Sequence, residues 1–193
     1  MSDRLVVGIT GASGAIYGIR LLERLRELPV ETHLVVSRWA GVTIEQETDD
    51  SLADVRALAD VAYGDNDQAA RISSGSFRTR GMVVAPCSTK TLAGIATGFG
   101  HNLVCRAADV TLKERRPLVL AVREAPLSAI HLRNMLTLAE LGATIVPPTP
   151  AFYARPASID ELVDYTVVRI LDQLGFELEP DSRWRGLKPP GDD

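Results

Sequence analysis

Short apolar runs alternate with longer stretches of helical periodicity along this chain of 193 residues. The short runs predict β-strands at 5–10, 32–37, 81–85, 118–122 and 144–146. Helical spacing predicts helices at 13–28, 38–47, 52–58, 90–97, 103–115 and 130–141, and a last helix after Ser158. The pattern therefore predicts an α/β fold with a single doubly wound, mostly parallel sheet and helices on both faces, in a Rossmann- or flavodoxin-like arrangement.

The last predicted helix and the segment after it differ in character. Ser158 and Glu161 form a capping-box pattern at the helix start. From about residue 175 the chain becomes a polar, proline-containing tail, and we expect one domain over 1–193 that ends in this tail. Trp184 lies in the tail, where a large aromatic side chain is costly to leave in water, so we expect it to dock on the protein or on a neighbouring subunit.

Composition narrows the class of partner and the compartment. The chain has 21 basic and 25 acidic residues, for a net charge of −4, which favours a small anionic ligand over nucleic acid. The two cysteines lack a CxxC spacing, and Cys87 fits a buried thiol better than a nucleophile. With no signal-peptide pattern and no apolar run of the ~20 residues that a membrane span needs, we expect a cytoplasmic protein. His33, His101 and His131 lie far apart, so we expect no metal site and surface or capping roles for them.

Polar residues follow three predicted strands at the sheet edge where ligands bind in such folds. The glycine-rich turn at 11–14 allows the backbone to approach a ligand, and the N–H groups of the helix that follows favour a phosphate. The segment 88–91 opens another helix with hydroxyl groups and a lysine. Arg123 and Glu124 follow the strand at 118–122. We therefore predict a phosphate-bearing ligand at this edge.

The residues argue against a dinucleotide. A dinucleotide site needs an acidic residue at the end of the second strand to hold a ribose, and Ser37 and Arg38 occupy that place. No Tyr-x-x-x-Lys pair supports NAD(P)-linked reduction. A single phosphate, as in flavin mononucleotide (FMN), fits better.

Each candidate residue also has a purely structural interpretation. The turn at 11–14 can serve close packing alone, and the charges at 113–116 suit a solvated helix end. Glu47 alone would be a surface glutamate. The proline-rich segment around Tyr153 can hold that ring over a ligand or simply connect two elements. Arg169 can extend harmlessly to solvent or point into a phosphate pocket.

Seven motifs carry a family resemblance: Thr10 to Ala15, Glu47 to Asp49, Pro86 to Ser88, Arg106 to Val110, Leu112 to Pro117, Arg123 to Pro126 and Pro150 to Tyr153. Together, over 5–184, they resemble the flavin prenyltransferase family, the UbiX-type proteins formerly described as 3-octaprenyl-4-hydroxybenzoate carboxy-lyases. The resemblance implies transfer of a dimethylallyl group from dimethylallyl phosphate to N5 and C6 of reduced FMN, without a metal. It also implies that a UbiD-type decarboxylase receives the prenylated FMN, and that the protein forms a homo-dodecamer with sites at subunit interfaces.

The same resemblance assigns roles to residues of this chain. It implies that FMN is held by Gly11, Ala12, Ser13, Ser37, Ser88, Thr89, Lys90, Thr91, Arg106 and Arg123. It implies that the prenyl phosphate is gathered by Lys113, Arg123, Tyr153 and Arg169. Its catalytic set is Ser13, Glu47, Lys113, Arg123, Glu124 and Trp184. In that set Ser13 and Glu124 assist proton movement, Glu47 contacts the developing cation or the phosphate network, and the Trp184 ring stabilises an allylic cation.

One conflict and two rival functions follow from the residues. A strand of five residues spans roughly 17 Å, so Lys113 and Arg123 cannot easily share a pocket within one subunit, and we predict that one serves a neighbour. A related FMN-binding cysteine decarboxylase should show a Pro-x-Met-Asn signature, which this chain lacks. A non-catalytic flavin carrier would not need the cationic and phenolic side chains together.

Overall fold

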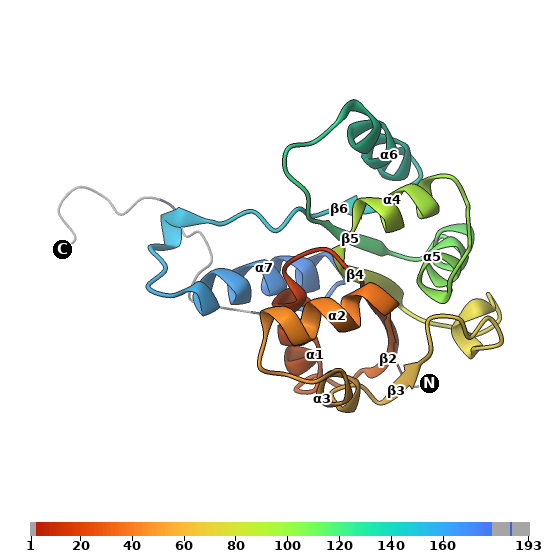
Figure 1. Cartoon of the computed structure of the whole chain (residues 1–193), viewed down its shortest axis with the longest axis horizontal. Coiled ribbons are helices and arrows are strands. Elements are labelled where there is room, and N and C mark those ends of the chain that lie inside the picture. The colour runs from red at the N-terminus through yellow and green to blue at the C-terminus, as the bar shows by residue number, and fades with distance from the viewer. Residues whose placement is uncertain (1–2, 179–185, 187–193) are drawn as a thin grey trace.

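Six parallel strands form one sheet in the order β3-β2-β1-β4-β5-β6 (Figure 1). The computed structural model describes residues 3–178 and 186. The strands are β1 (Arg4–Ile9), β2 (Glu31–Val36), β3 (Val61–Tyr63), β4 (Gly81–Cys87), β5 (Leu118–Val122) and β6 (Thr144–Ile145). Consecutive strands β1 and β2 lie on one side of the sheet centre and β4 to β6 on the other, which confirms the predicted doubly wound fold.

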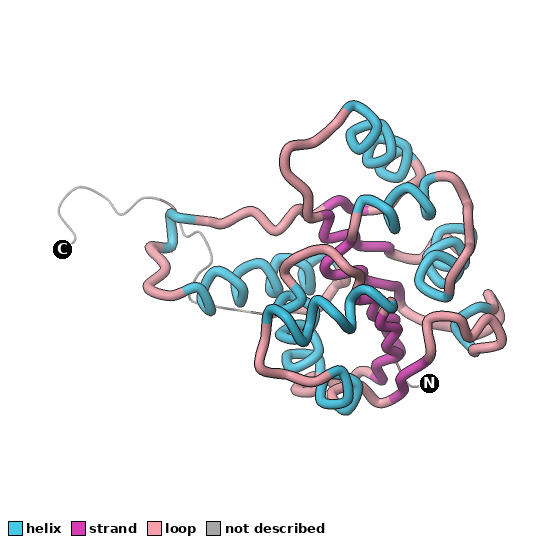
Figure 2. Tube along the Cα trace, in the orientation of Figure 1, coloured by secondary structure: helices cyan, strands magenta, loops and turns pink. Residues whose placement is uncertain are grey.

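Helices cover both faces of the sheet (Figure 2). One face packs against α1 (Ala15–Leu25), α2 (Arg38–Glu47), α3 (Leu52–Ala57) and α7 (Ile159–Gln173). The other packs against α4 (Thr89–Ala96), α5 (Leu103–Lys113) and α6 (Ala129–Glu140). Side chains alternate between the two cores, as with Val7 and Val6 of β1, because successive residues of a strand point to opposite faces. Two short 3-10 turns, η1 (Arg71–Ser73) and η2 (Phe152–Ala154), lie in the loops.

The predicted elements are present, with small corrections. The predictions omitted β3, a strand of three partly or fully exposed residues that gains its identity only by pairing with β2. The first helix ends at Leu25, before the predicted end. Ser158 caps α7 as predicted, but the Glu161 carboxylate accepts a hydrogen bond from Ala157 N at 2.8 Å instead of closing the box. Element boundaries thus depended on pairing and capping partners that lie outside each local pattern.

The predicted surface role is wrong for His33. Its ring is fully buried in β2, where it makes hydrogen bonds with the Tyr63 hydroxyl at 2.9 Å and the Glu31 carboxylate at 3.1 Å. Burial lowers the pKa of His33 despite the neighbouring carboxylate. The expected capping role does hold for His131, whose ring accepts a hydrogen bond from Ser128 N at the start of α6.

One loop leaves the body of the molecule. The segment 147–158, which we call the arm, runs from β6 out to η2 and then back into α7 (Figure 1). The arm is largely exposed, and none of the η2 residues is buried. Among the described residues no helix combines the length and apolar character needed to cross a membrane.

Candidate functional site

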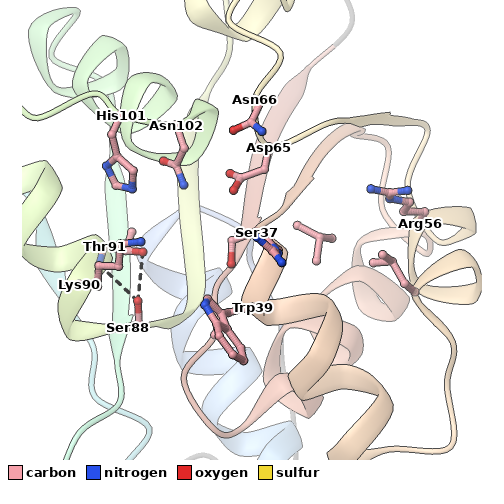
Figure 3. A pocket seen from close by; sticks show the side chains of 14 residues that line it. Ser37, Trp39, Arg56, Asp65, Asn66, Ser88, Lys90, Thr91, His101 and Asn102 are labelled. Atoms are coloured by element: carbon pink, nitrogen blue, oxygen red, sulfur yellow. Dashed lines mark hydrogen bonds between the residues drawn. The ribbon is translucent and has the colours of Figure 1, made fainter.

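The carboxyl ends of β1 and β4 mark the point where the strand order reverses. Helices that leave these two strands turn to opposite faces of the sheet, which opens a crevice for a ligand. A cavity of about 650 Å³ lies there, lined by residues that follow β1, β2, β3 and β4 (Figure 3). The sheet topology therefore places the cavity where two of the three predicted polar segments meet, 11–14 and 88–91, whereas Arg123 and Glu124 do not line it.

A buried threonine joins two of the loops around the cavity. Thr10 is 1% exposed, and its Oγ1 donates to Pro86 O at 2.7 Å. Thr10 Oγ1 also accepts a hydrogen bond from Ser88 N at 2.8 Å. A β-carbon on Gly11 would lie 2.6 Å from Trp39 Cβ, so only glycine allows the first loop to approach α2 this closely. These contacts hold the loops in place without help from a ligand.

Two of the helices that begin at this cavity are capped by serines. Ser37 caps α2 and accepts a hydrogen bond from Ala40 N at 3.3 Å, while Ser88 caps α4 and accepts one from Thr91 N at 3.2 Å. Ser37, Ser88, Lys90 and Thr91 all line the cavity, as Figure 3 shows. Helix N-termini carry partial positive charge, and Lys90 adds a full one. This side of the cavity is therefore suited to an anion such as a phosphate.

The opposite wall offers an acceptor. Asp65 Oδ1 is buried at the cavity and has no hydrogen-bond partner among the described residues. Asn66 and Asn102 lie beside it (Figure 3). A carboxylate oxygen accepts hydrogen bonds only, and leaving it buried and unpaired is costly. The cavity thus fits a ligand that carries both a phosphate and hydroxyl groups, as FMN does with its ribityl chain.

The turn at 11–14 has a partner that the sequence did not predict. Gly14 N and Ala15 N, at the start of α1, donate to the Glu47 carboxylate at 2.8 and 3.1 Å. A side chain of this protein therefore occupies the place where we expected a phosphate. The correction follows from α2, because its last residue is brought beside the first residues of α1.

Glu47 is held in its charged form. Burial acts to raise the pKa of its carboxyl, but hydrogen bonds from Ser13 and the two backbone N–H groups outweigh it. The positive charge of Arg123 acts in the same direction, so the pKa of Glu47 lies below its ordinary value. Ser13, Glu47 and Arg123 therefore form one interacting group, although they come from three loops or helices and do not line the cavity.

Arg123 and Glu124 lie where the sequence predicted them, at the carboxyl end of β5. Arg123 N donates to Cys87 O at 3.1 Å, which ties this loop to the end of β4. Burial raises the pKa of Tyr17, and the positive charge of Arg123 partly offsets this effect. The Glu124 carboxylate is exposed and accepts a hydrogen bond from Ala125 N at 3.0 Å.

Cys87, at the end of β4, is fully buried, and burial raises the pKa of its thiol. It therefore has the structural character that the sequence predicted.

Other predicted residues lie elsewhere in the chain. Lys113 ends α5, at the far end of β5 from Arg123, and its ammonium pairs with Glu114. Arg106, on α5, donates to Asp109 at 2.8 Å and to Ser73 O at 3.2 Å. Tyr153 belongs to the arm and Arg169 to α7. None of these side chains lines the cavity. Trp184 lies outside the described residues.

The fold and the cavity define a doubly wound α/β protein that is built to bind a phosphate-bearing ligand at its switch point. Comparison with known proteins specifies the class. The Flavoprotein family matches residues 1–171. A probable UbiX-like flavin prenyltransferase of Streptomyces sp. (strain D7) is 62% identical over 186 residues, which are 96% of this chain and 93% of that protein.

Two solved structures are also similar. A crystal structure of AnUbiX (PadA1) in complex with FMN and dimethylallyl pyrophosphate superposes with a TM-score of 0.93, at 54% identity over 97% of this chain and all of that one. A dodecameric FMN-dependent UbiX-like decarboxylase from Escherichia coli O157:H7 gives 0.92, at 59% identity over 95% of this chain and all of that one. The chain belongs to the flavoprotein family and, within it, to the UbiX-like flavin prenyltransferases.

Sequence reasoning missed part of the site. Asp65, Asn66, Asn102 and Trp39 line the cavity and were not among the predicted residues. The first two belong to a Gly-Asp-Asn-Asp stretch, which indicates a loop of the kind that lines sites in α/β proteins without singling out a residue. That loop reaches the cavity because Leu103 N donates to Asp65 O at 2.7 Å, a contact between segments almost forty residues apart that no local pattern reveals.

Proposed function

We propose that this protein joins a dimethylallyl group from dimethylallyl phosphate to N5 and C6 of reduced FMN and releases phosphate. The observation that carries the proposal is the convergence of two helix N-termini and an unpartnered carboxylate oxygen on one cavity. FMN fits this arrangement because it has a phosphate at one end of a hydroxyl-bearing chain. The name of the Streptomyces relative and the ligands of the AnUbiX crystal structure support the same reaction.

The proposed FMN site follows the charges of the cavity. The phosphate lies at the N-termini of α2 and α4, held by Ser37 and residues 88–91. The ribityl hydroxyls donate to Asp65. The ring system lies toward Gly11, Ala12, Ser13 and Arg123, beyond the ends of β1 and β5. When bound in reduced form, FMN supplies the nucleophilic N5 and C6 atoms.

The group of Ser13, Glu47 and Arg123 supplies charge and proton transfer in this proposal. Glu47 is ionised at neutral pH because its pKa is lowered, so its carboxylate can stabilise positive charge on the allylic group. Ser13 and Glu124 move protons at N5 and C6. Trp184 offers its π face to the allylic cation.

The side chains that the family resemblance assigns to the prenyl phosphate, Lys113, Tyr153 and Arg169, do not line the cavity of their own chain. We propose that Lys113, Tyr153 and Arg169 hold this phosphate, with Arg106 in support, and that they serve the cavity of a neighbouring copy. The exposed arm supports this assignment, and the related decarboxylase from Escherichia coli O157:H7 is dodecameric. A homo-dodecamer with sites between subunits would bring both sets of residues together.

The remaining proposals concern context. We propose that the chain is one flavoprotein domain with a polar tail from about 175, and that it works in the cytoplasm, which suits its two free, buried thiols Cys87 and Cys105. Because prenylated FMN is itself a cofactor for decarboxylation, a UbiD-type decarboxylase receives the product.

The test is a mass measurement. Under anaerobic conditions, the protein is incubated with reduced FMN and either dimethylallyl phosphate or dimethylallyl pyrophosphate, and the flavin is analysed by mass spectrometry. We expect a flavin heavier by one C5H8 unit. Bound FMN without any mass gain would support the flavin carrier instead. Oxidative loss of carbon dioxide from a cysteine-ended peptide would support the cysteine decarboxylase.

A further inference from the structure

Two tyrosines, one from the arm and one from α7, contact each other. The hydroxyl oxygens of Tyr153, in η2, and Tyr165, in α7, lie 2.7 Å apart, so one donates a hydrogen bond to the other. Their rings cross nearly at right angles, with centroids 5.9 Å apart. Both hydroxyl and ring geometry therefore place the Tyr153 side chain against Tyr165.

The two partners differ in how firmly they are held. Helix α7 is anchored, because Val163, Val167 and Ile170 are buried in the core. Arg20 of α1 also pairs with two aspartates in the first turns of α7, Asp160 at 3.1 Å and Asp164 at 2.7 Å. Tyr153, by contrast, is 47% exposed on a turn without any buried residue. The contact with Tyr165 thus links an exposed turn to a packed helix.

A cation lies in the same group. Arg169 follows Tyr165 by four residues, one helical turn, and its charge acts on the Tyr153 phenol. An ordinary tyrosine phenol keeps its proton at neutral pH, so Tyr153 has a proton to donate. A protonated phenol beside a guanidinium is suited to a phosphate, which accepts hydrogen bonds and carries negative charge.

The direction of the hydrogen bond follows from this chemistry. If Tyr153 donates its only proton to a phosphate oxygen, its own oxygen can still accept, and the Tyr165 hydroxyl lies 2.7 Å away as a donor. Donation from Tyr165 also polarises the Tyr153 O–H bond and strengthens its outward hydrogen bond. We propose that Tyr165 is a positioning residue that orients the Tyr153 hydroxyl toward the phosphate of the prenyl donor. This inference rests on the proposed function, in which Tyr153 meets that phosphate.

The experiment compares Tyr165→Phe with the wild-type enzyme in steady-state kinetics. The substitution removes one hydroxyl and keeps the ring. We expect the KM for dimethylallyl phosphate to rise by roughly two- to tenfold, the value of one neutral hydrogen bond, with kcat and the KM for reduced FMN unchanged. Tyr63→Phe is the matched control, because it also removes a tyrosine hydroxyl, one that makes a hydrogen bond with His33 in the sheet. The KM of this variant for the prenyl donor should not change.

A double mutant separates positioning from a general structural role. In a Tyr153→Phe background, adding Tyr165→Phe should have no further effect on the KM for dimethylallyl phosphate, since Tyr165 acts through the missing hydroxyl. An unchanged KM in Tyr165→Phe, or an equal rise in both backgrounds, would overturn the inference alone. A wild-type protein that makes no prenylated FMN would overturn both this inference and the proposed function.

Discussion

The cavity at the switch point and the arm differ in what completes them. The cavity is assembled by one chain, from loops that Thr10 joins and from helices that Ser37 and Ser88 cap. The arm carries Tyr153 on an exposed turn that projects from the body (Figure 1). In the proposed function, flavin binding is therefore a property of the subunit, whereas capture of the prenyl phosphate depends on a second copy.

The largest expected effect comes from mixing two inactive variants. Glu47→Gln disables the cavity side and Arg169→Ala disables the arm side, and each alone should lose at least about a hundredfold in turnover. If each site combines the cavity of one chain with the arm of another, random mixed assembly leaves about a quarter of the sites intact. Activity of the co-assembled variants measures this recovery. An absence of recovery, with mixed assembly verified by mass, would mean that both sides act within one chain.

A smaller loss is expected from Glu124→Gln. Glu124 is exposed at the end of β5 and accepts only a local hydrogen bond from Ala125 N, so the substitution should not disturb the fold. Removing a proton-transfer group should slow formation of prenylated FMN by about a hundredfold while FMN remains bound. Rapid-quench mass spectrometry and flavin absorbance measure the two properties. Equal product rates in variant and wild type would exclude this role for Glu124.

The FMN affinity should respond more modestly to Ser88→Ala. The variant loses the cap of α4 and a hydroxyl at the proposed phosphate site, so we expect FMN to bind roughly tenfold more weakly in equilibrium dialysis. Ser128→Ala is the matched control because Ser128 caps α6, away from the cavity. A similar loss of affinity in both variants would indicate that capping, and not phosphate contact, is responsible.

The smallest effect concerns stability against pH. Because the folded protein lowers the pKa of Glu47, this group stabilises the fold above its ordinary pKa of 4.5. That stabilisation is lost as the pH falls below 4.5 and through the lowered value. The melting temperature of Glu47→Gln should therefore differ most from wild type near pH 7, and the difference should shrink in acid. A difference in melting temperature that is constant with pH would mean that the hydrogen bonds from Gly14 N and Ala15 N to the ionised Glu47 carboxylate are not its source.

The helix starts show how far local sequence can predict a site. Ser158 caps α7 as predicted, and Ser88 caps the helix that the segment 88–91 was expected to open, because an N-cap needs only a short polar side chain and the N–H groups that follow it. Strand β5 matched its apolar run residue for residue. These features depend on neighbours within a few positions, so sequence periodicity contains them.

The identity of the anion at α1 shows where that reasoning stops. The turn at 11–14 has the composition of a phosphate loop, yet its N–H groups bind Glu47. Asp65 likewise reaches the cavity only through the contact of its loop with the start of α5. Both outcomes depend on how two distant segments approach each other, which no local pattern records.

The sequence by itself determined the alternation of strands and helices, the capped helix starts and the family to which the chain belongs. These follow from periodicity, from short-range hydrogen bonding and from motifs that are read in order along the chain. Only the tertiary structure decided that Glu47 occupies the α1 N-terminus, that Asp65 Oδ1 is buried at the cavity without a partner among the described residues, and that Tyr153 lies away from the cavity. The physical reason is that packing brings distant residues within hydrogen-bond distance, and both charge and burial are set at those contacts.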